Sequence, residues 1–214
     1  LELAKKGMGY VSPNPMVGCV VVFNDQIIGE GYHHKQDTFH AEVNAIENVE
    51  DKSLLKKSTL YVNLEPCAHF EKTPPCTNLI IESEIPKVVI GCRDSYSEVS
   101  GKGIEKMQNT GIEVIVGVLE KESRELNKRF FTFHEKKKPY VILKWAESKD
   151  GFMAPKNQNK PFWMTSSESK KLVHKWRDEE DAILVGRITA EKDNPSLTVR
   201  EVPGNNPIRI IIDR

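Results

Sequence analysis

This 214-residue chain has neither an excess of one charge nor a long run of apolar residues. Its 31 basic residues are balanced by 31 acidic ones, so the sequence lacks the basic surface that nucleic acids require. No segment has the length and apolar character of a signal peptide or a membrane span. A mean hydropathy of −0.47 and 29% charged residues are typical of a soluble globular protein. We therefore expect a cytoplasmic protein that acts on a small molecule, without nucleic acid or membrane as a partner.

Cysteine is also scarce, with four residues in the whole chain. Two disulfides are one explanation, but the reducing conditions of the cytoplasm disfavour them. Cys19 and Cys92 lie in β-branched, apolar runs, where a free cysteine is typical of a protein core. Cys67 and Cys76 instead flank a polar, proline-rich loop at 68–75. These two thiols are therefore the candidates for chemistry.

A histidine and a glutamate complete a pattern with these two cysteines. The pattern is His40-x-Glu42 followed by Pro-Cys67 and, after the loop, Cys76. One imidazole and two thiolates leave the fourth position of a tetrahedral Zn²⁺ open, which marks a catalytic rather than a structural site. Zinc lowers the pKa of a bound water, and Glu42 could carry that water's proton to a leaving amine. The pattern is typical of zinc-dependent nucleobase deaminases, although their cysteines are usually closer together.

Apolar runs alternate with helical patterns over the first 137 residues, which predicts an α/β sandwich with its site where strands lead into helices. A helix over 40–49 would place His40 and Glu42 in its first turn, where free N–H groups favour a carboxylate. Pro66 cannot extend a strand ladder, so Cys67 should lie just past a strand end, and Cys76 should begin a helix. The expected strands are 16–23, 26–32, 59–64, 87–92 and 112–118, and the expected helices are 40–49, 76–85, 103–109 and 121–133.

The charged stretch 134–139, which ends in proline, predicts a boundary between a first domain at 1–137 and a second at 138–214. The second region has the expected strands 140–145, 182–186 and 208–212 and an expected helix at 167–177. Three strands are few for an α/β domain of this kind, so we expect this domain to be incomplete here. A glycine-rich dinucleotide fingerprint is lacking, which argues against a Rossmann fold.

Several longer segments point to a known family. They are Ser-Pro-Asn-Pro-Met-Val-Gly at 12–18, Leu-Glu-Pro-Cys-Ala-His-Phe-Glu-Lys-Thr-Pro-Pro-Cys at 64–76, Leu-Lys-Trp-Ala-Glu-Ser-Lys-Asp-Gly at 143–151, Asp-Ala-Ile-Leu-Val-Gly at 181–186, and Asp-Asn-Pro-Ser-Leu-Thr-Val-Arg at 193–200. With these segments the chain resembles the bifunctional pyrimidine deaminase/reductase of riboflavin biosynthesis over nearly its whole length. The resemblance implies a cytidine-deaminase-like α/β/α sandwich followed by an incomplete dihydrofolate-reductase-like α/β domain.

The resemblance also implies an activity and a set of deaminase residues. The first domain would use Zn²⁺ to deaminate 2,5-diamino-6-(5-phosphoribosylamino)pyrimidin-4(3H)-one, and the protein would be a homo-oligomer. His40, Cys67 and Cys76 would hold the zinc, and Glu42 would move the proton. Lysine and histidine suit a phosphate, although an ordinary surface lysine is the competing explanation for Lys72. The residues that would bind this phosphoribosylated pyrimidine are Asn14, His69, Lys72 and Asp94.

For the second domain, the resemblance implies reduction of the ribose by NADPH. Arginine binds phosphate through a planar pair of donors, although a solvated helix surface also explains Arg177. The implied substrate residues are Arg177, Ser196, Leu197 and Arg200. The implied cofactor residues are Lys144, Trp163, Thr189 and Asp193, and for Trp163 a plain core aromatic is the competing explanation. The family's other cofactor residues would lie past Arg214, so we expect little reductase turnover from these residues alone.

Two other functions fit parts of the pattern. One is a deaminase for cytidine, deoxycytidylate or an adenosine in tRNA, but the long loop between the cysteines, the second region and the neutral charge disfavour it. The other is a zinc-stabilised binding module without enzyme activity. Such a module needs four protein ligands, and His69 is the one nearby candidate for the fourth.

Overall fold

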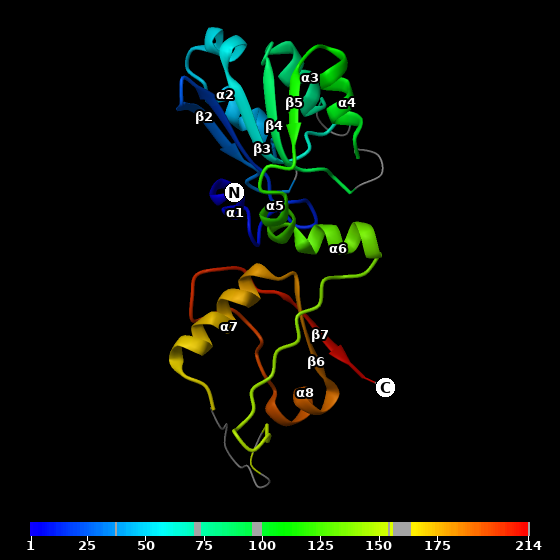
Figure 1. The fold of residues 1–214 in the computed structure, drawn as a ribbon. Coiled ribbons are helices and arrows are strands. Elements are labelled where there is room, and N and C mark those ends of the chain that lie inside the picture. The colour runs from blue at the N-terminus through cyan, green and yellow to red at the C-terminus, as the bar shows by residue number, and fades with distance from the viewer. Residues whose placement is uncertain (37, 71–73, 96–99, 154, 156–163, 214) are drawn as a thin grey trace. The chain divides into compact units, whose positions relative to one another are not determined.

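The structure is a computed structural model that describes residues 1–36, 38–70, 74–95, 100–153, 155 and 164–213 (Figure 1). By its internal contacts the chain divides into two compact units, Leu1–Tyr140 and Val141–Arg214. Each unit is treated below by itself. Within the described ranges, no helix has both the length and the apolar character needed to cross a membrane.

The first unit is built on a five-stranded mixed sheet with the strand order β2-β1-β3-β4-β5. The β1–β2 hairpin turns at Asn24 and Asp25, which both have positive φ, a conformation that asparagine and aspartate adopt more readily than other residues with side chains. The pairs β1–β2 and β1–β3 are antiparallel, whereas β3–β4 and β4–β5 are parallel. The strands are β1 (Gly18–Phe23), β2 (Gln26–Tyr32), β3 (Thr59–Leu64), β4 (Lys87–Cys92) and β5 (Glu113–Val116).

Helices pack against this sheet and enclose the main core (Figure 1). Leu60, Ile80, Ile90 and Met107 are fully buried in it. β4 is a nearly continuous apolar run because it lies inside the sheet and is buried on both faces. The helices of this unit are α1 (Glu2–Lys5), α2 (Ala41–Glu47), the 3₁₀ helix η1 (Lys52–Lys57), α3 (Cys76–Glu82), α4 (Lys102–Asn109), α5 (Glu120–Leu126) and α6 (Lys128–Lys136).

The helix predicted over 121–133 is wrong in one respect, because Asn127 divides it into α5 and α6. The buried Asn127 side chain is committed to the backbone of Met16 instead of to solvent. Its Oδ1 accepts the Met16 N–H at 2.8 Å, and its Nδ2 donates to the Met16 carbonyl at 2.9 Å. Asn63 donates to the same carbonyl at 3.0 Å and accepts the Gly18 N–H at 2.7 Å. Two asparagines thus fix the segment that leads into β1.

The second unit contains α7 (Ser167–Glu179), β6 (Ala182–Gly186), α8 (Arg187–Asp193) and β7 (Ile208–Ile212). β6 and β7 are parallel neighbours in a two-stranded sheet. The Ser166 hydroxyl caps α7 by accepting the Ser169 N–H at 3.3 Å. The α/β class predicted from the sequence is confirmed in both units.

The strand predicted over 140–145 is wrong. This run forms no strand, and Val141, Leu143 and Trp145 in it are exposed. A strand is stabilised by a neighbouring ladder and by burial of one face, and the described part of the chain gives this run neither. The continuous run of apolar residues was therefore a misleading signal at this position.

Candidate active site

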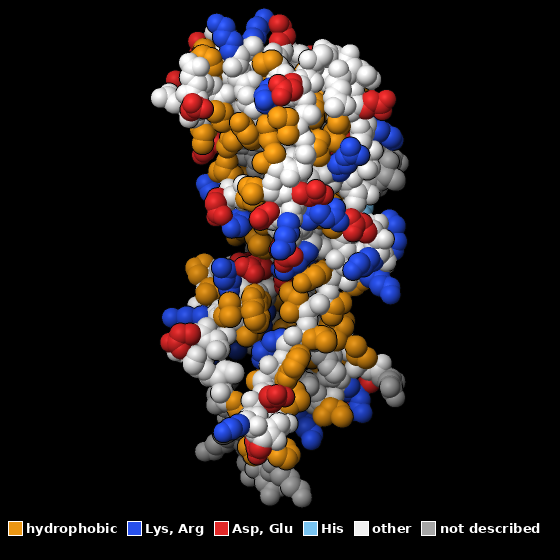
Figure 2. Space-filling view, in the orientation of Figure 1, with side chains coloured by type: hydrophobic (Ala, Val, Ile, Leu, Met, Phe, Trp, Pro, Cys, Tyr) orange, Lys and Arg blue, Asp and Glu red, His pale blue; other side chains and the backbone are white. Residues whose placement is uncertain are grey.

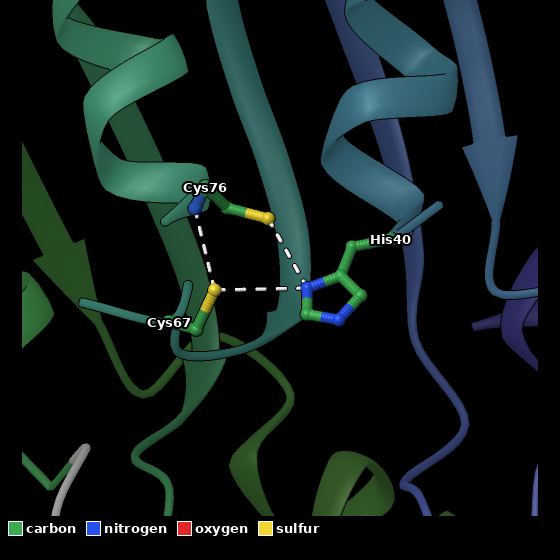
Figure 3. A group of neighbouring side chains, drawn as sticks. All are labelled: His40, Cys67 and Cys76. Carbon is green, nitrogen blue, oxygen red and sulfur yellow. Dashed lines mark hydrogen bonds between the residues drawn. The ribbon is translucent and has the colours of Figure 1, made fainter. Parts of the chain in front are cut away.

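Three side chains from three different elements meet in the first unit (Figure 3). His40 is the N-cap residue of α2, Cys67 follows β3, and Cys76 is the first residue of α3. The His40 Nδ1 atom lies 3.6 Å from the Cys67 Sγ and 3.3 Å from the Cys76 Sγ. Figure 3 shows the two sulfurs and this nitrogen pointing toward one another. His40 was predicted inside the first helical turn, but it has extended backbone angles and lies one residue before the helix.

The donor set and its spacing fit a zinc ion. The three ligand atoms all lie within 4.8 Å of one another. Zn–S bonds near 2.3 Å and Zn–N bonds near 2.0 Å at tetrahedral angles place nitrogen and sulfur about 3.5 Å apart. Both observed nitrogen–sulfur distances are close to this value. Among the residues that the structure describes, this is the one group of three or more histidine, cysteine or acidic side chains with such geometry.

The local electrostatics favour a thiolate at Cys67. A hydrogen bond from the Cys76 thiol is the largest cause that lowers the pKa of Cys67 to about 4, and it outweighs the effect of partial burial. His40 and the Cys76 N–H, which lies 3.3 Å from the Cys67 Sγ, act in the same direction. The pKa of Cys76 is raised well above its usual value, because this thiol faces the neighbouring thiolate in a buried position. One anion and one proton donor therefore share the site, as expected for two thiols that lie ready for a cation.

Glu42 lies beside this group in the first turn of α2 and is 3% exposed. Burial is the main cause that raises the pKa of its carboxyl group, and the nearby His40 opposes this shift. A carboxyl group with a raised pKa binds a proton more readily than one in water, which suits it to general acid/base chemistry. The arrangement can therefore combine a metal ion with a proton carrier.

Strand register brings the loops around this site to one edge of the sheet. Leu64 pairs with Cys92 in the parallel β3–β4 ladder, so both strands end at this edge. Gly18 pairs with Tyr32, so β1 begins and β2 ends there too. Cys19 pairs with Val62 near the end of β3, which places the β1–β2 hairpin ends at the same edge. The segments before β1 and after β2, β3 and β4 therefore converge.

Three of the predicted substrate residues lie in these converging segments. Asn14 is half-buried before β1, His69 is half-buried two residues after Cys67, and Asp94 is buried two residues after β4. The fourth, Lys72, lies outside the described residues. Asn14, His69 and Asp94, which span 80 positions of the sequence, therefore lie at the edge of the sheet that also carries Cys67.

Two further buried residues of this edge, His33 and Glu65, were not predicted from the sequence. His33 follows β2, is 3% exposed, and its ring centre lies 5.5 Å from that of His40. Within the described part of the chain its Nε2 atom has no hydrogen-bond partner. Glu65 lies between β3 and Cys67, and its carboxylate accepts backbone N–H groups of the Asp94 segment and of α4. The only signal for Glu65 was its position two residues before a candidate ligand.

In the second unit, three of the four predicted substrate residues, Arg177, Ser196 and Arg200, form a compact group with His174. This buried histidine accepts the Arg200 N–H at its Nδ1 atom, over 3.0 Å, and its Nε2 atom lies 3.4 Å from Nη1 of Arg177. Arg200 donates to the Ser196 hydroxyl at 2.8 Å, and Arg177 donates to the Thr198 carbonyl at 3.0 Å. Burial and the two arginine charges lower the pKa of His174, so its neutral, hydrogen-bond-accepting form is favoured. The sequence did not indicate His174.

The other predicted residues of this unit are more dispersed. Leu197 is buried beside Ser196 and has a positive φ of 53°. Thr189 and Asp193 are exposed on α8, and Lys144 is exposed in the run that forms no strand. Trp163 lies outside the described residues. The structure therefore brings together the expected phosphate ligands of this unit, while the expected cofactor residues form no comparable group.

Comparison with known families agrees with both units. Residues 1–92, which include His40, Cys67 and Cys76, match the family described as the cytidine and deoxycytidylate deaminase zinc-binding region. Residues 139–214 match the RibD C-terminal domain. The first unit therefore has the cytidine-deaminase-like fold that the sequence predicted, and a RibD C-terminal domain follows it.

Individual relatives match the chain over its full length. The riboflavin biosynthesis protein RibD of Aquifex aeolicus is 51% identical over 214 residues, which are 100% of this chain and 59% of that protein. A solved relative is the Thermotoga maritima protein whose crystal structure is described as a diaminohydroxyphosphoribosylaminopyrimidine deaminase/5-amino-6-(5-phosphoribosylamino)uracil reductase. Its sequence is 50% identical and its TM-score is 0.92, and the match covers 100% of this chain and 60% of that one.

A more distant solved structure supports the fold alone. The Rib2 deaminase of Aspergillus oryzae is 22% identical, has a TM-score of 0.50, and the match covers 63% of this chain and 90% of that one. The present chain spans about 60% of the length of the RibD relatives above. Its two regions match two family models, and about half of its residues are identical to those of the Aquifex and Thermotoga proteins. The chain therefore belongs to the RibD family of riboflavin biosynthesis proteins.

Proposed function

We propose that the first unit catalyses the zinc-dependent hydrolytic deamination of 2,5-diamino-6-(5-phosphoribosylamino)pyrimidin-4(3H)-one, within a homo-oligomeric protein. The observation that carries the proposal is the placement of His40, Cys67 and Cys76 within ligand distance of one another, beside the buried Glu42. When bound, zinc supplies an activated water at the position that the three ligands leave open. The match of residues 1–92 to a deaminase zinc-binding region supports this assignment.

The chain's own residues would carry out the proton transfers. Glu42 takes a proton from the attacking water and donates it to the amino group, so that nitrogen leaves the ring as ammonia. Its burial strengthens its interaction with the reacting groups, because little solvent competes for the same proton. The N-terminal turn of α2, which carries Glu42, supplies partial positive charge that stabilises the carboxylate after it has given up the proton.

Substrate recognition would come from the loops at the same edge of the sheet. Asn14 and Asp94 would hydrogen-bond to the pyrimidine or the ribose, and the fixed segment before β1 keeps Asn14 in place. His69 and Lys72 would bind the ribose phosphate, because both can offer a positive charge and donors to its oxygens. Both lie between the two cysteine ligands, so a bound metal would also restrain the ends of their loop.

We propose that the second unit supplies substrate contacts for an NADPH-dependent reduction of the ribose in the longer protein. His174 lies beside the guanidinium of Arg177 and accepts the backbone N–H of Arg200, and the guanidinium groups of these two arginines would bind the substrate phosphate. Ser196 and Leu197 would line the sugar site beside them. Lys144, Trp163, Thr189 and Asp193 would contact the cofactor.

Ammonia release from a set of substrates tests the deaminase assignment. We expect the zinc-loaded protein to release ammonia from the phosphoribosylaminopyrimidine and to lose this activity with a chelator, and zinc should restore it. We expect release from cytidine, deoxycytidylate and tRNA adenosine to be lower by about 10²-fold or more, because these substrates lack the diaminopyrimidinone groups that Asn14 and Asp94 would contact, and cytidine also lacks the phosphate. Equal or faster release from cytidine would contradict the proposal and favour an ordinary nucleoside deaminase.

A further inference from the structure

Glu65 is a buried carboxylate that is held by backbone groups. It is 3% exposed and lies directly between the last residue of β3 and Pro66. In the described ranges no lysine or arginine forms an ion pair with it. A buried carboxylate is costly unless hydrogen bonds replace its lost hydration, so its partners indicate why it is there.

Four backbone N–H groups donate to the two oxygens of Glu65. Oε2 accepts from Asp94 at 3.3 Å and from Gly101 at 3.0 Å. Oε1 accepts from Gly103 at 3.1 Å and from Ile104 at 3.3 Å. One side chain therefore accepts N–H groups at the start of α4 and also holds the backbone of Asp94, two residues after β4.

The start of α4 depends on this arrangement. Its N-cap residue is Gly101, which has a φ of 80° and offers no side-chain cap. The usual capping side chain is replaced by Glu65, whose charge also interacts favourably with the N-terminal end of the helix. A Cβ atom on Gly103 would lie 2.3 Å from the Pro66 carbonyl oxygen, so α4 begins in direct contact with the backbone that leads to Cys67.

We propose that Glu65 is a positioning residue of the deaminase site. It holds Asp94 and the start of α4 against the segment from Glu65 to Cys67. The spacing between Asp94, which would bind the substrate, and Cys67, which would bind the metal, is thereby kept constant. This inference rests on the proposed deaminase function. In the described part of the chain, the hydrogen bonds of the Glu65 carboxylate go to backbone N–H groups and not to the side chains of His40, Cys67 or Cys76. Its effect passes through Asp94, whose backbone it holds, and through Cys67, two residues along the chain.

The substitution Glu65→Gln tests this role because it keeps the shape of the side chain. An amide has one acceptor oxygen and one NH₂ group, so two of the four backbone donors would face another donor. We expect kcat/KM for the pyrimidine substrate to fall by about 10- to 100-fold, mainly through a higher KM, with kcat within about threefold of the wild type and zinc content unchanged. The control is Glu105→Gln, which removes a charge from an exposed position in the first turn of α4 and should leave KM unchanged.

Two outcomes would overturn the proposal. One is an unchanged KM in a folded, zinc-loaded Glu65→Gln protein, and the other is a loss of kcat and zinc together at constant KM.

Amide hydrogen exchange in the wild type gives an independent test that needs no variant. We expect the N–H groups of Gly101, Gly103 and Ile104 to be strongly protected, and exchange as fast as at an open helix end would contradict the inference. If the wild type releases no ammonia, the proposed function fails, whereas the exchange result still tests the Glu65 contacts.

Discussion

Replacing Glu42 with glutamine should abolish most deamination while the zinc site stays intact. Glutamine has the shape of glutamate but cannot take up and return a proton at neutral pH. General acid/base catalysis by a positioned side chain contributes about 10²–10⁴-fold, so kcat should fall by a factor in this range. Because Glu42 is not one of the three grouped ligand side chains, the zinc content of the variant should match that of the wild type.

Rates of ammonia release and metal analysis of the same preparations check this prediction. The matched control is Glu47→Gln in the last turn of α2, where the side chain is exposed and lies 3.6 Å from Lys52 in a surface ion pair. Such a pair contributes little, so this variant should keep the wild-type rate. A Glu42→Gln protein that retained full activity would exclude Glu42 as the proton carrier.

Replacing Cys76 with alanine should remove both the metal and the activity. Cys76 is buried, and its sulfur lies 3.3 Å from the His40 Nδ1 atom, so no other thiol can take its place. Removing a residue that only hydrogen-bonds to a metal ligand already lowers metal affinity by about 10–100-fold. Removing a ligand itself should lower the affinity further. We therefore expect zinc affinity to fall by more than about 10²-fold and deamination to fall in parallel.

A second cysteine variant separates metal binding from the general loss of a buried thiol. Cys19 is as buried as Cys76 but lies within β1, outside the group of ligand atoms. Cys19→Ala should lower stability slightly, through lost packing, while zinc content and the rate per folded molecule stay the same. Equal zinc content in the Cys76→Ala and wild-type proteins would contradict the assignment of Cys76 as a ligand.

The grouping of His40, Cys67 and Cys76 could be predicted from the sequence because their residue types and spacing are typical of a zinc site. The strands β3, β4, β6 and β7 could be predicted within their observed bounds because β-branched and apolar residues are concentrated in them. The convergence of Asn14, Cys67 and Asp94 at one edge could be expected only in outline. It depends on the register of three strands, which residue patterns do not specify.

The residues that support the site were missed for a physical reason. Asn63, Glu65 and Asn127 are single polar residues within or beside apolar segments, and their partners lie elsewhere in the chain. The Asn127 contact with Met16 joins residues 111 positions apart. No local pattern predicts such a contact, because a buried polar group becomes informative only when its hydrogen-bond partners are known. The division of the helix at Asn127 has the same origin.

The most direct test of the account is zinc-edge X-ray absorption of the zinc-loaded protein. We expect one zinc per chain with two sulfur neighbours at about 2.3 Å, one histidine nitrogen, and one oxygen that does not come from the protein. This set corresponds to Cys67, Cys76, His40 and an open position for water. Absence of bound zinc, or four ligands that all come from protein side chains, would contradict it.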